Sequence, residues 1–191
     1  MGDIVLAGST SGTTTLTPAA VSGTTTLTLP ATTGTITTKD TNGILSVNGV
    51  QFPSTQSASA DANCLDDYEE GTWTPTVGGT ATYTTASGTY TKVGKLVHCI
   101  FEIQINVIGT GSTSVMSGLP FTNASLIASG SVSYYSSLAT ATNFISCYLV
   151  NSSTQINFTG NTASASTIGL NSFVIFGNST RIIGSVTYQT S

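Results

Sequence analysis

The longest regular pattern in the chain is an alternation of apolar and polar side chains over residues 96–108. The apolar positions are Val97, Cys99, Phe101, Ile103, Ile105 and Val107, and they alternate with His98, Glu102, Gln104 and Asn106. A repeat of two residues is the period of a β-strand, whose successive side chains point to opposite faces of a sheet. We therefore predict a long strand with one face in the core and the other toward solvent.

The composition extends this prediction to the whole chain. Ser and Thr occupy 63 of the 191 positions, yet the mean hydropathy is +0.24 and the net charge is only -4. Disordered segments combine low hydropathy with high net charge, so a disordered stalk is disfavoured. Thr, Val, Ile and the aromatic residues are favoured in strands because they pack well on a pleated surface. The expected fold class is all-β.

The spacing of turn residues predicts the architecture of the C-terminal part. Clusters of Gly, Asn and Ser separate further expected strands at 74–77, 81–84, 89–93, 112–116, 128–135, 144–150, 155–158, 172–176 and 181–188. This pattern is typical of an antiparallel sandwich or jelly roll. Helical periodicity never exceeds about two turns, and the one short helix that it allows is at residues 61–70, capped by Asp61. We predict an antiparallel, jelly-roll-like β-sandwich over residues 66–191.

A threonine-rich repeat with a period of 11 residues fills residues 11–37, and each unit predicts a short strand and a turn. Each repeat strand has only one or two large apolar side chains, and the side chains that we predict to make the contacts of this N-terminal region are Ile4, Leu6, Leu16, Leu27, Leu29 and Ile36. They cannot offset a backbone ordering cost of about 1 to 2 kcal/mol per residue. We therefore expect residues 1–53 to be an assembly arm that buries these side chains on other copies or on another protein. Residues 54–65, small and without periodicity, are the expected linker.

No set of residues predicts a catalytic, cofactor-binding or metal site. His98 is the only histidine, and Glu102 on the same strand face is about 13 Å away, too far for a general-base pair. A Gly-rich stretch resembles a phosphate loop only superficially. Five residues instead of four separate Gly88 from Gly94, and Leu96 stands where Ser or Thr would bind magnesium. We expect no enzymatic activity and no cofactor.

Charge and hydropathy exclude two classes of partner. The four basic residues are scattered, so no patch can neutralise a row of phosphates, and nucleic acid is not an expected partner: Lys39, Lys92, Lys95 and Arg181. No apolar run approaches the roughly 20 residues that span a bilayer, so no membrane partner is expected. The N-terminus lacks the basic start of a signal peptide, which predicts a product of the cytoplasm.

The cysteines do not predict a disulfide framework. Cys64, Cys99 and Cys147 are odd in number, widely spaced and without a CxxC pair. Cys99 and Cys147 lie in apolar strand patterns, where a free cysteine behaves as a small buried hydrophobic residue. We predict that both are reduced and buried.

Half of the carboxylates and the only tryptophan lie in a single stretch, Leu65-Asp66-Asp67-Tyr68-Glu69-Glu70-Gly71-Thr72-Trp73-Thr74-Pro75. Two later strings accompany it, Gly88-Thr89-Tyr90-Thr91-Lys92-Val93-Gly94 and Gly118-Leu119-Pro120-Phe121. Together they resemble a module of tailed-bacteriophage virion proteins that occurs in tail fibres and in head fibres or decoration proteins. The threonine-rich repeat resembles the segment that often precedes this module.

The resemblance implies a virion structural protein. Because the chain is short and has no long shaft, we expect a capsid decoration, cement or head-fibre protein. Its arm would anchor to the major capsid protein, with the sandwich projecting from the outer surface of a virion assembled in the host cytoplasm. Modules of this kind are usually threefold, which implies a homotrimer. The alternative is a short tail fibre, a receptor-binding protein that recognises host-surface glycans.

Two possible binding features stay open. One cluster offers the oxygen ligands that calcium prefers, although its spacing does not match an EF-hand: Asp61, Asn63, Asp66, Asp67, Glu69 and Glu70. The other interpretation of this cluster is a solvated turn or short helix that docks Tyr68 and Trp73. Tyr134 and Tyr135 are candidate glycan contacts, but neighbouring strand residues face opposite ways, so we expect one of them in the core.

Overall fold

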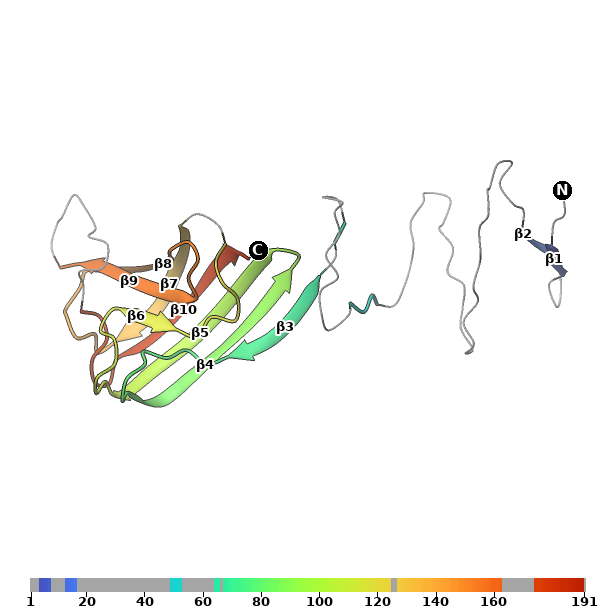
Figure 1. Ribbon diagram of the computed structural model, residues 1–191. Coiled ribbons are helices and arrows are strands. Elements are labelled where there is room, and N and C mark those ends of the chain that lie inside the picture. Colours follow the sequence, from blue (N-terminus) through green and yellow to red (C-terminus); the bar gives the residue numbers. More distant parts are fainter. Residues whose placement is uncertain are drawn as a thin grey trace. The chain divides into compact units, whose positions relative to one another are not determined.

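The computed structural model describes residues 4–7, 13–16, 49–52, 64–65, 67–124, 127–162 and 174–190, the first two ranges as backbone only. The chain divides into two units, Met1–Val50 and Gln51–Ser191. The described residues form strands and connections with no helix, and thus no helix suited to crossing a membrane (Figure 1). The all-β prediction is confirmed. Residues 54–63 of the predicted linker lie outside the described ranges.

The described part of the N-terminal unit includes a short antiparallel pair of strands. Strand β1 (Ile4–Ala7) pairs with β2 (Thr13–Leu16), and Ile4 is the register partner of Leu16. Leu6 is also on β1, opposite a threonine of the first repeat. The remaining apolar residues of the predicted arm, Leu27, Leu29 and Ile36, lie outside the described residues.

The C-terminal unit is built on one antiparallel sheet. Its strands are β3 (Tyr68–Trp73), β4 (Thr82–Val93), β5 (Leu96–Val107), β6 (Val115–Ser117), β7 (Ala128–Ser136), β8 (Phe144–Leu149), β9 (Gln155–Asn161) and β10 (Arg181–Gln189). Their order is β3-β4-β5-β10-β7-β8-β9-β6. The C-terminal strand therefore lies in the middle of the sheet, between β5 and β7 (Figure 1).

The sheet curls until distant strands meet. Three strands separate β5 from β9 in the sheet order, yet the rings of Phe101 on β5 and Phe158 on β9 have centroids 6.2 Å apart. The curl also brings the two ends of the sheet together, because Thr76, just after β3, bridges Ser117 on β6 through backbone hydrogen bonds of 3.0 and 2.7 Å. The enclosed space is filled by one apolar core.

The predicted long strand forms the inner wall of this core. The alternating positions from Val97 to Ile105 are at most 1% exposed, so the predicted inward face is confirmed over these five positions. The prediction is wrong for Val107, which is 47% exposed. Val107 pairs with the exposed Thr82, beyond a register irregularity of β4 near Tyr83 that interrupts the inward row.

The predicted helix at residues 61–70 is wrong where the structure describes it. Strand β3 begins at Tyr68, and its ladder with β4 runs from the Tyr68–Val93 pair to the Trp73–Gly88 pair. Cross-strand pairing of six residues outweighs the helical preference of two neighbouring glutamates.

Four other strand predictions need correction. Segments 81–84 and 89–93 belong to the single strand β4, because Gly88 continues the ladder instead of ending it. Segment 74–77 contributes only the Thr76 bridge. Residues 174–177 are not a strand, although Ile175 and Phe176 are buried and both donate their backbone N–H to the Thr113 carbonyl.

Candidate functional site

The three stretches that carry the phage resemblance come together in space, although they lie far apart in the chain. Strand β3 supplies the first stretch and pairs along its length with the second, on β4. The third packs on both. The ring of Phe121 lies edge-on to Tyr90 at 5.3 Å, and Gly118 comes so close to Thr74 that an added Cβ would collide with the Thr74 carbonyl oxygen. We call this group of contacts the motif cluster.

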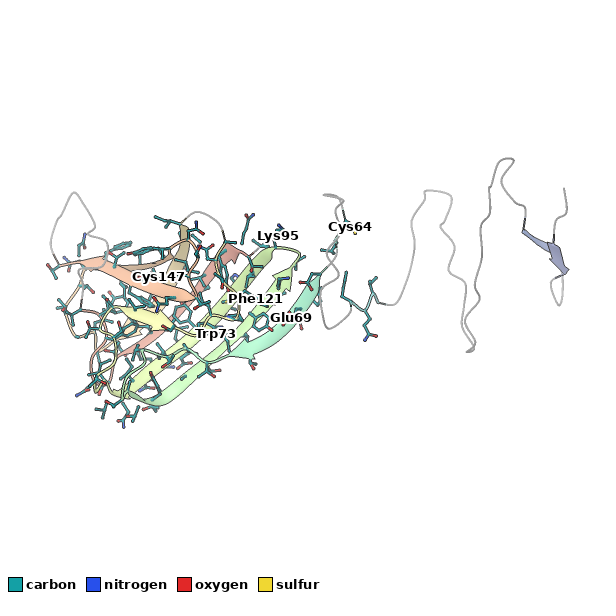
Figure 2. The ribbon with its side chains drawn as sticks, viewed as in Figure 1. Cys64, Glu69, Trp73, Lys95, Phe121 and Cys147 are labelled. Carbon is teal, nitrogen blue, oxygen red and sulfur yellow. The ribbon has the colours of Figure 1, made fainter. Side chains whose placement is uncertain are left out.

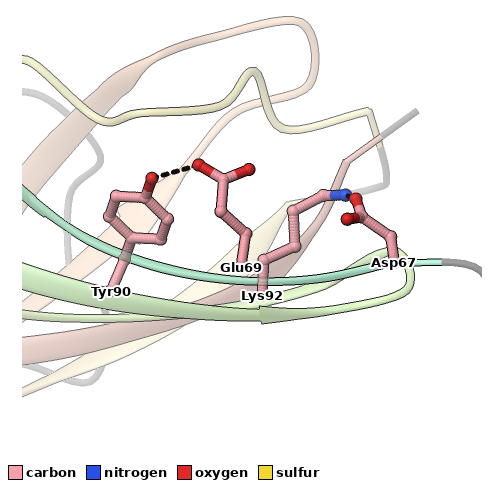
Figure 3. Close-up of polar contacts among 4 residues, drawn as sticks. All are labelled: Asp67, Glu69, Tyr90 and Lys92. Atoms are coloured by element: carbon pink, nitrogen blue, oxygen red, sulfur yellow. Dashed lines mark hydrogen bonds and ion pairs between the residues drawn. The ribbon is translucent and has the colours of Figure 1, made fainter. Parts of the chain in front are cut away.

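A buried ion pair is part of the motif cluster, near the end of the β3–β4 ladder (Figure 3). Lys92 is 4% exposed and Asp67 is 6% exposed, and the ammonium group of Lys92 donates to Oδ2 of Asp67. The Lys92 ammonium also lies 5.5 Å from the centre of the Phe121 ring. Each charge is thus compensated where water is largely excluded. Nothing in the sequence signals this pair, because 25 positions separate its members.

A second polar contact ties β3 to β4 on the same side of the sheet (Figure 3). The phenol of Tyr90 donates to Oε1 of Glu69. This hydrogen bond to the carboxylate, together with burial, raises the pKa of Tyr90 to about 12. The ring of Tyr90 lies against its register partner Gly71, where an added Cβ would be 2.6 Å from Cε1. The contacts of the motif cluster hold an edge strand in place.

The acidic cluster does not form a cation cage within the described residues. Asp67 is committed to Lys92, Glu69 accepts from Tyr90, and Glu70 accepts from Tyr68. Over the described ranges, no group of three or more His, Cys, Asp or Glu side chains is placed to hold a metal ion. Asp61, Asn63 and Asp66 lie outside those ranges.

His98, Glu102 and the Gly-rich stretch each make contacts that belong to the sheet. His98 lies on the outer face of β5, and its Nδ1 is 2.9 Å from the hydroxyl of Thr187 on β10. Glu102, on the same face, pairs with Arg181 instead, with both Nε and Nη2 of the guanidinium 2.8 Å from Oε1. The Gly-rich stretch from Gly88 is the second half of β4 and its turn into β5, not a phosphate loop.

Tyr134 and Tyr135 only partly follow the sequence prediction. Tyr134 pairs with Ile183 and Tyr135 with the buried Ile182, so their side chains leave opposite faces of the sheet. The expectation that one of them is in the core is wrong, because they are 46% and 40% exposed. A bulge of β7 at this point, between its pairings with Ile183 and Gly184, disturbs the regular ladder.

The outer face of the sheet has a shallow hollow next to Tyr134. It measures about 210 Å³ and is lined by Ser87, Gly88, Thr89, Ile100, Phe101, Glu102 and Ile183. The Arg181 guanidinium bridges its rim, because it pairs with Glu102 and lies 5.4 Å from the centre of the Tyr134 ring. An apolar floor, a fixed carboxylate and an adjacent aromatic ring are the elements of a site for a small polar ligand.

The cysteines follow the prediction. Cys99 and Cys147 are free and buried, and Cys64 is free and exposed. Burial raises the pKa of both buried thiols to about 12, so they stay neutral at physiological pH. Figure 2 shows Cys147 within the folded unit and Cys64 beyond the start of β3.

No protein-family model, curated protein or solved structure matches this chain.

Proposed function

We propose that this chain is a structural protein of a tailed-bacteriophage virion, of the capsid decoration, cement or head-fibre type. The observation that supports this proposal is the motif cluster. If the three strings resembled the phage module only by chance, there would be no reason for them to touch in the fold. Strings that belong to one folded module are expected to contact one another. Their contacts through Trp73, Tyr90, Lys92 and Phe121 are those expected of one module.

We propose, in addition, that the chain consists of an assembly arm and a sandwich. Residues 1–53 are a threonine-rich assembly arm that anchors to the major capsid protein, and residues 66–191 are a jelly-roll-like sandwich that projects from the outer surface of the particle. Edge-on ring contacts support the sandwich, since Phe101 on β5 meets Phe158 on β9, a strand far away in the sheet order, and Phe158 meets Phe176 in the segment before β10. The oligomer is a homotrimer, assembled in the host cytoplasm.

The test of location is the copy number in purified virions of the phage that encodes the chain. Quantitative mass spectrometry against the major capsid protein measures it directly. A decoration or head-fibre protein is present in numbers set by the capsid lattice, and its loss leaves particles that break under milder heat or salt stress but still adsorb to host cells. Absence from the virion would overturn the whole proposal.

The alternative proposal is a short tail fibre that recognises host-surface glycans. It is favoured by the hollow beside Tyr134, where an aromatic ring, Arg181 and Glu102 surround an apolar floor. In this case the copy number follows the low symmetry of a tail. Particles without the protein would be as robust as the wild type and would fail to adsorb. Tyr134→Ala would reduce adsorption, while Tyr135→Ala, on the opposite face, serves as its matched control.

A further inference from the structure

Exposed apolar side chains gather at the end of the sheet where β4 turns into β5. Tyr68, Val93 and Leu96 form one row across three neighbouring strands, because each is the register partner of the next. Their exposed fractions are 45%, 42% and 49%. Leu65, 55% exposed, extends the row across the turn, where its Cδ1 lies 4.0 Å from the position of a Cβ added to Gly94. We call these four side chains the turn patch.

On the outer face, the row next to the turn patch is polar and contains Glu70, Thr91, His98 and Thr187. One row further, Ile100 is 50% exposed, but its register partners are Thr89 and Ser185. Four large apolar side chains exposed side by side are typical of a contact surface.

Charges of opposite sign flank the turn patch. Glu70 follows Tyr68 on the same face of β3, and Lys95 lies in the turn next to Leu96. Both are exposed, and Lys95 takes part in no salt bridge within the described residues. In a head-to-tail contact, one side of the turn patch in each copy meets the other side of the patch in the next copy. The side with Lys95 therefore meets the side with Glu70.

We propose that the turn patch is the contact between copies of this chain in a closed ring. Its apolar row is buried there, and Lys95 of each copy faces Glu70 of the following copy. This inference rests on the proposed homo-oligomer and adds the surface by which the C-terminal units meet.

The first test compares two substitutions on strand β5 in the full-length chain, by sedimentation over a range of concentrations. Leu96→Asp places a charge in the turn patch, and Val107→Asp places one at the other end of the strand, at a position of similar exposure (49% and 47%). We expect Leu96→Asp to raise the dissociation constant of the oligomer at least roughly tenfold relative to Val107→Asp. Equal constants, or a wild-type chain that stays monomeric at all concentrations, would overturn the inference.

A charge exchange tests the direction of the contact. Lys95→Glu sets two acidic flanks against each other and is expected to weaken association about two- to fivefold. Adding Glu70→Lys restores the opposite charges and the association. If the double variant is no stronger than Lys95→Glu, the head-to-tail pairing is wrong.

Cys64 provides an independent readout, because it is the exposed cysteine next to the turn patch. A short bismaleimide should join wild-type copies into covalent dimers, whereas at the same concentration Leu96→Asp should give fewer and Cys64→Ser should give none. Failure of the wild-type oligomer to cross-link would contradict the inference. These results concern the purified chain alone, so they are independent of the virion copy number that tests the proposed function.

Discussion

The indole ring of Trp73 on β3 lies directly against Gly88, its register partner on β4. An added Cβ at Gly88 would be 2.5 Å from Cε2 of the indole, closer than atoms can approach. The relationship repeats across the sheet, since Gly88 also pairs with Phe101 on β5 and Phe101 pairs with Gly184 on β10. Aromatic residues and glycines thus alternate along one inward row, and each large ring uses the space that a glycine leaves.

Replacing Gly88 with alanine should therefore destabilise the C-terminal unit. The added methyl group forces Trp73 from its position, and overpacking of this kind costs about 1 to 3 kcal/mol. Urea unfolding followed by the fluorescence of Trp73, the only tryptophan, measures the loss. Thr89→Ala is the matched control, because Thr89 is exposed on the other face of the same strand. Equal stability of the two variants would show that the indole does not depend on the glycine.

The Asp67–Lys92 pair should respond to substitution far more than the pair between Arg181 and Glu102. Asp67→Asn leaves a buried ammonium without its counter-charge, a change that typically costs about 3 to 5 kcal/mol. Glu102→Gln affects a pair whose side chains are 37% and 31% exposed, where about 1 kcal/mol or less is expected. Urea midpoints of both variants test the contrast. Comparable losses would contradict the assigned burial of the Asp67 pair.

The stability of the unit should fall as the pH rises above about 9. Burial raises the pKa of the Cys99 and Cys147 thiols from the ordinary 9.0 to about 12. Below pH 9 both states keep the protons and stability is unaffected. Between about 9 and 12 only the unfolded chain releases them, which favours unfolding. Urea midpoints from pH 8 to about 11 should decline, and the decline should be shallower in the Cys99→Ala, Cys147→Ala double variant. A parallel decline in the two proteins would exclude the thiols as its cause.

The assembly arm should depend on the leucines that occupy the same place in successive repeats. Truncating a buried leucine to alanine costs about 2 to 5 kcal/mol, a large loss for an interface with few apolar side chains. We expect the Leu16→Ala, Leu27→Ala double variant to be absent from virions, while the unfolding of the C-terminal unit is unchanged. Thr15→Ala with Thr26→Ala is the control at neighbouring repeat positions. Normal incorporation of the leucine variant would show that the arm is not the anchor.

Local pattern was sufficient to predict the fold class and the long central strand. The alternating apolar residues from Val97 to Ile105 form a buried row of β5. Alternate side chains of a strand all point to the same face of the sheet, so an apolar set with a period of two is buried together. The same reasoning predicted buried thiols at Cys99 and Cys147. It was wrong at the ends of elements, as at Val107, where the core stops although the pattern continues.

Only the tertiary structure determined which contacts the residues of the motif strings make. Asp67 and Lys92 are both charged residues of low intrinsic preference for a core, and only the pairing of β3 with β4 and the packing of Phe121 turn them into a buried ion pair. Similarly, Gly88 looks like a turn residue in the sequence and is a strand residue in the fold, because the space that it leaves is filled by Trp73. Alternation along a strand is a local property of the backbone, whereas the choice of neighbouring strand depends on contacts between residues far apart in the chain.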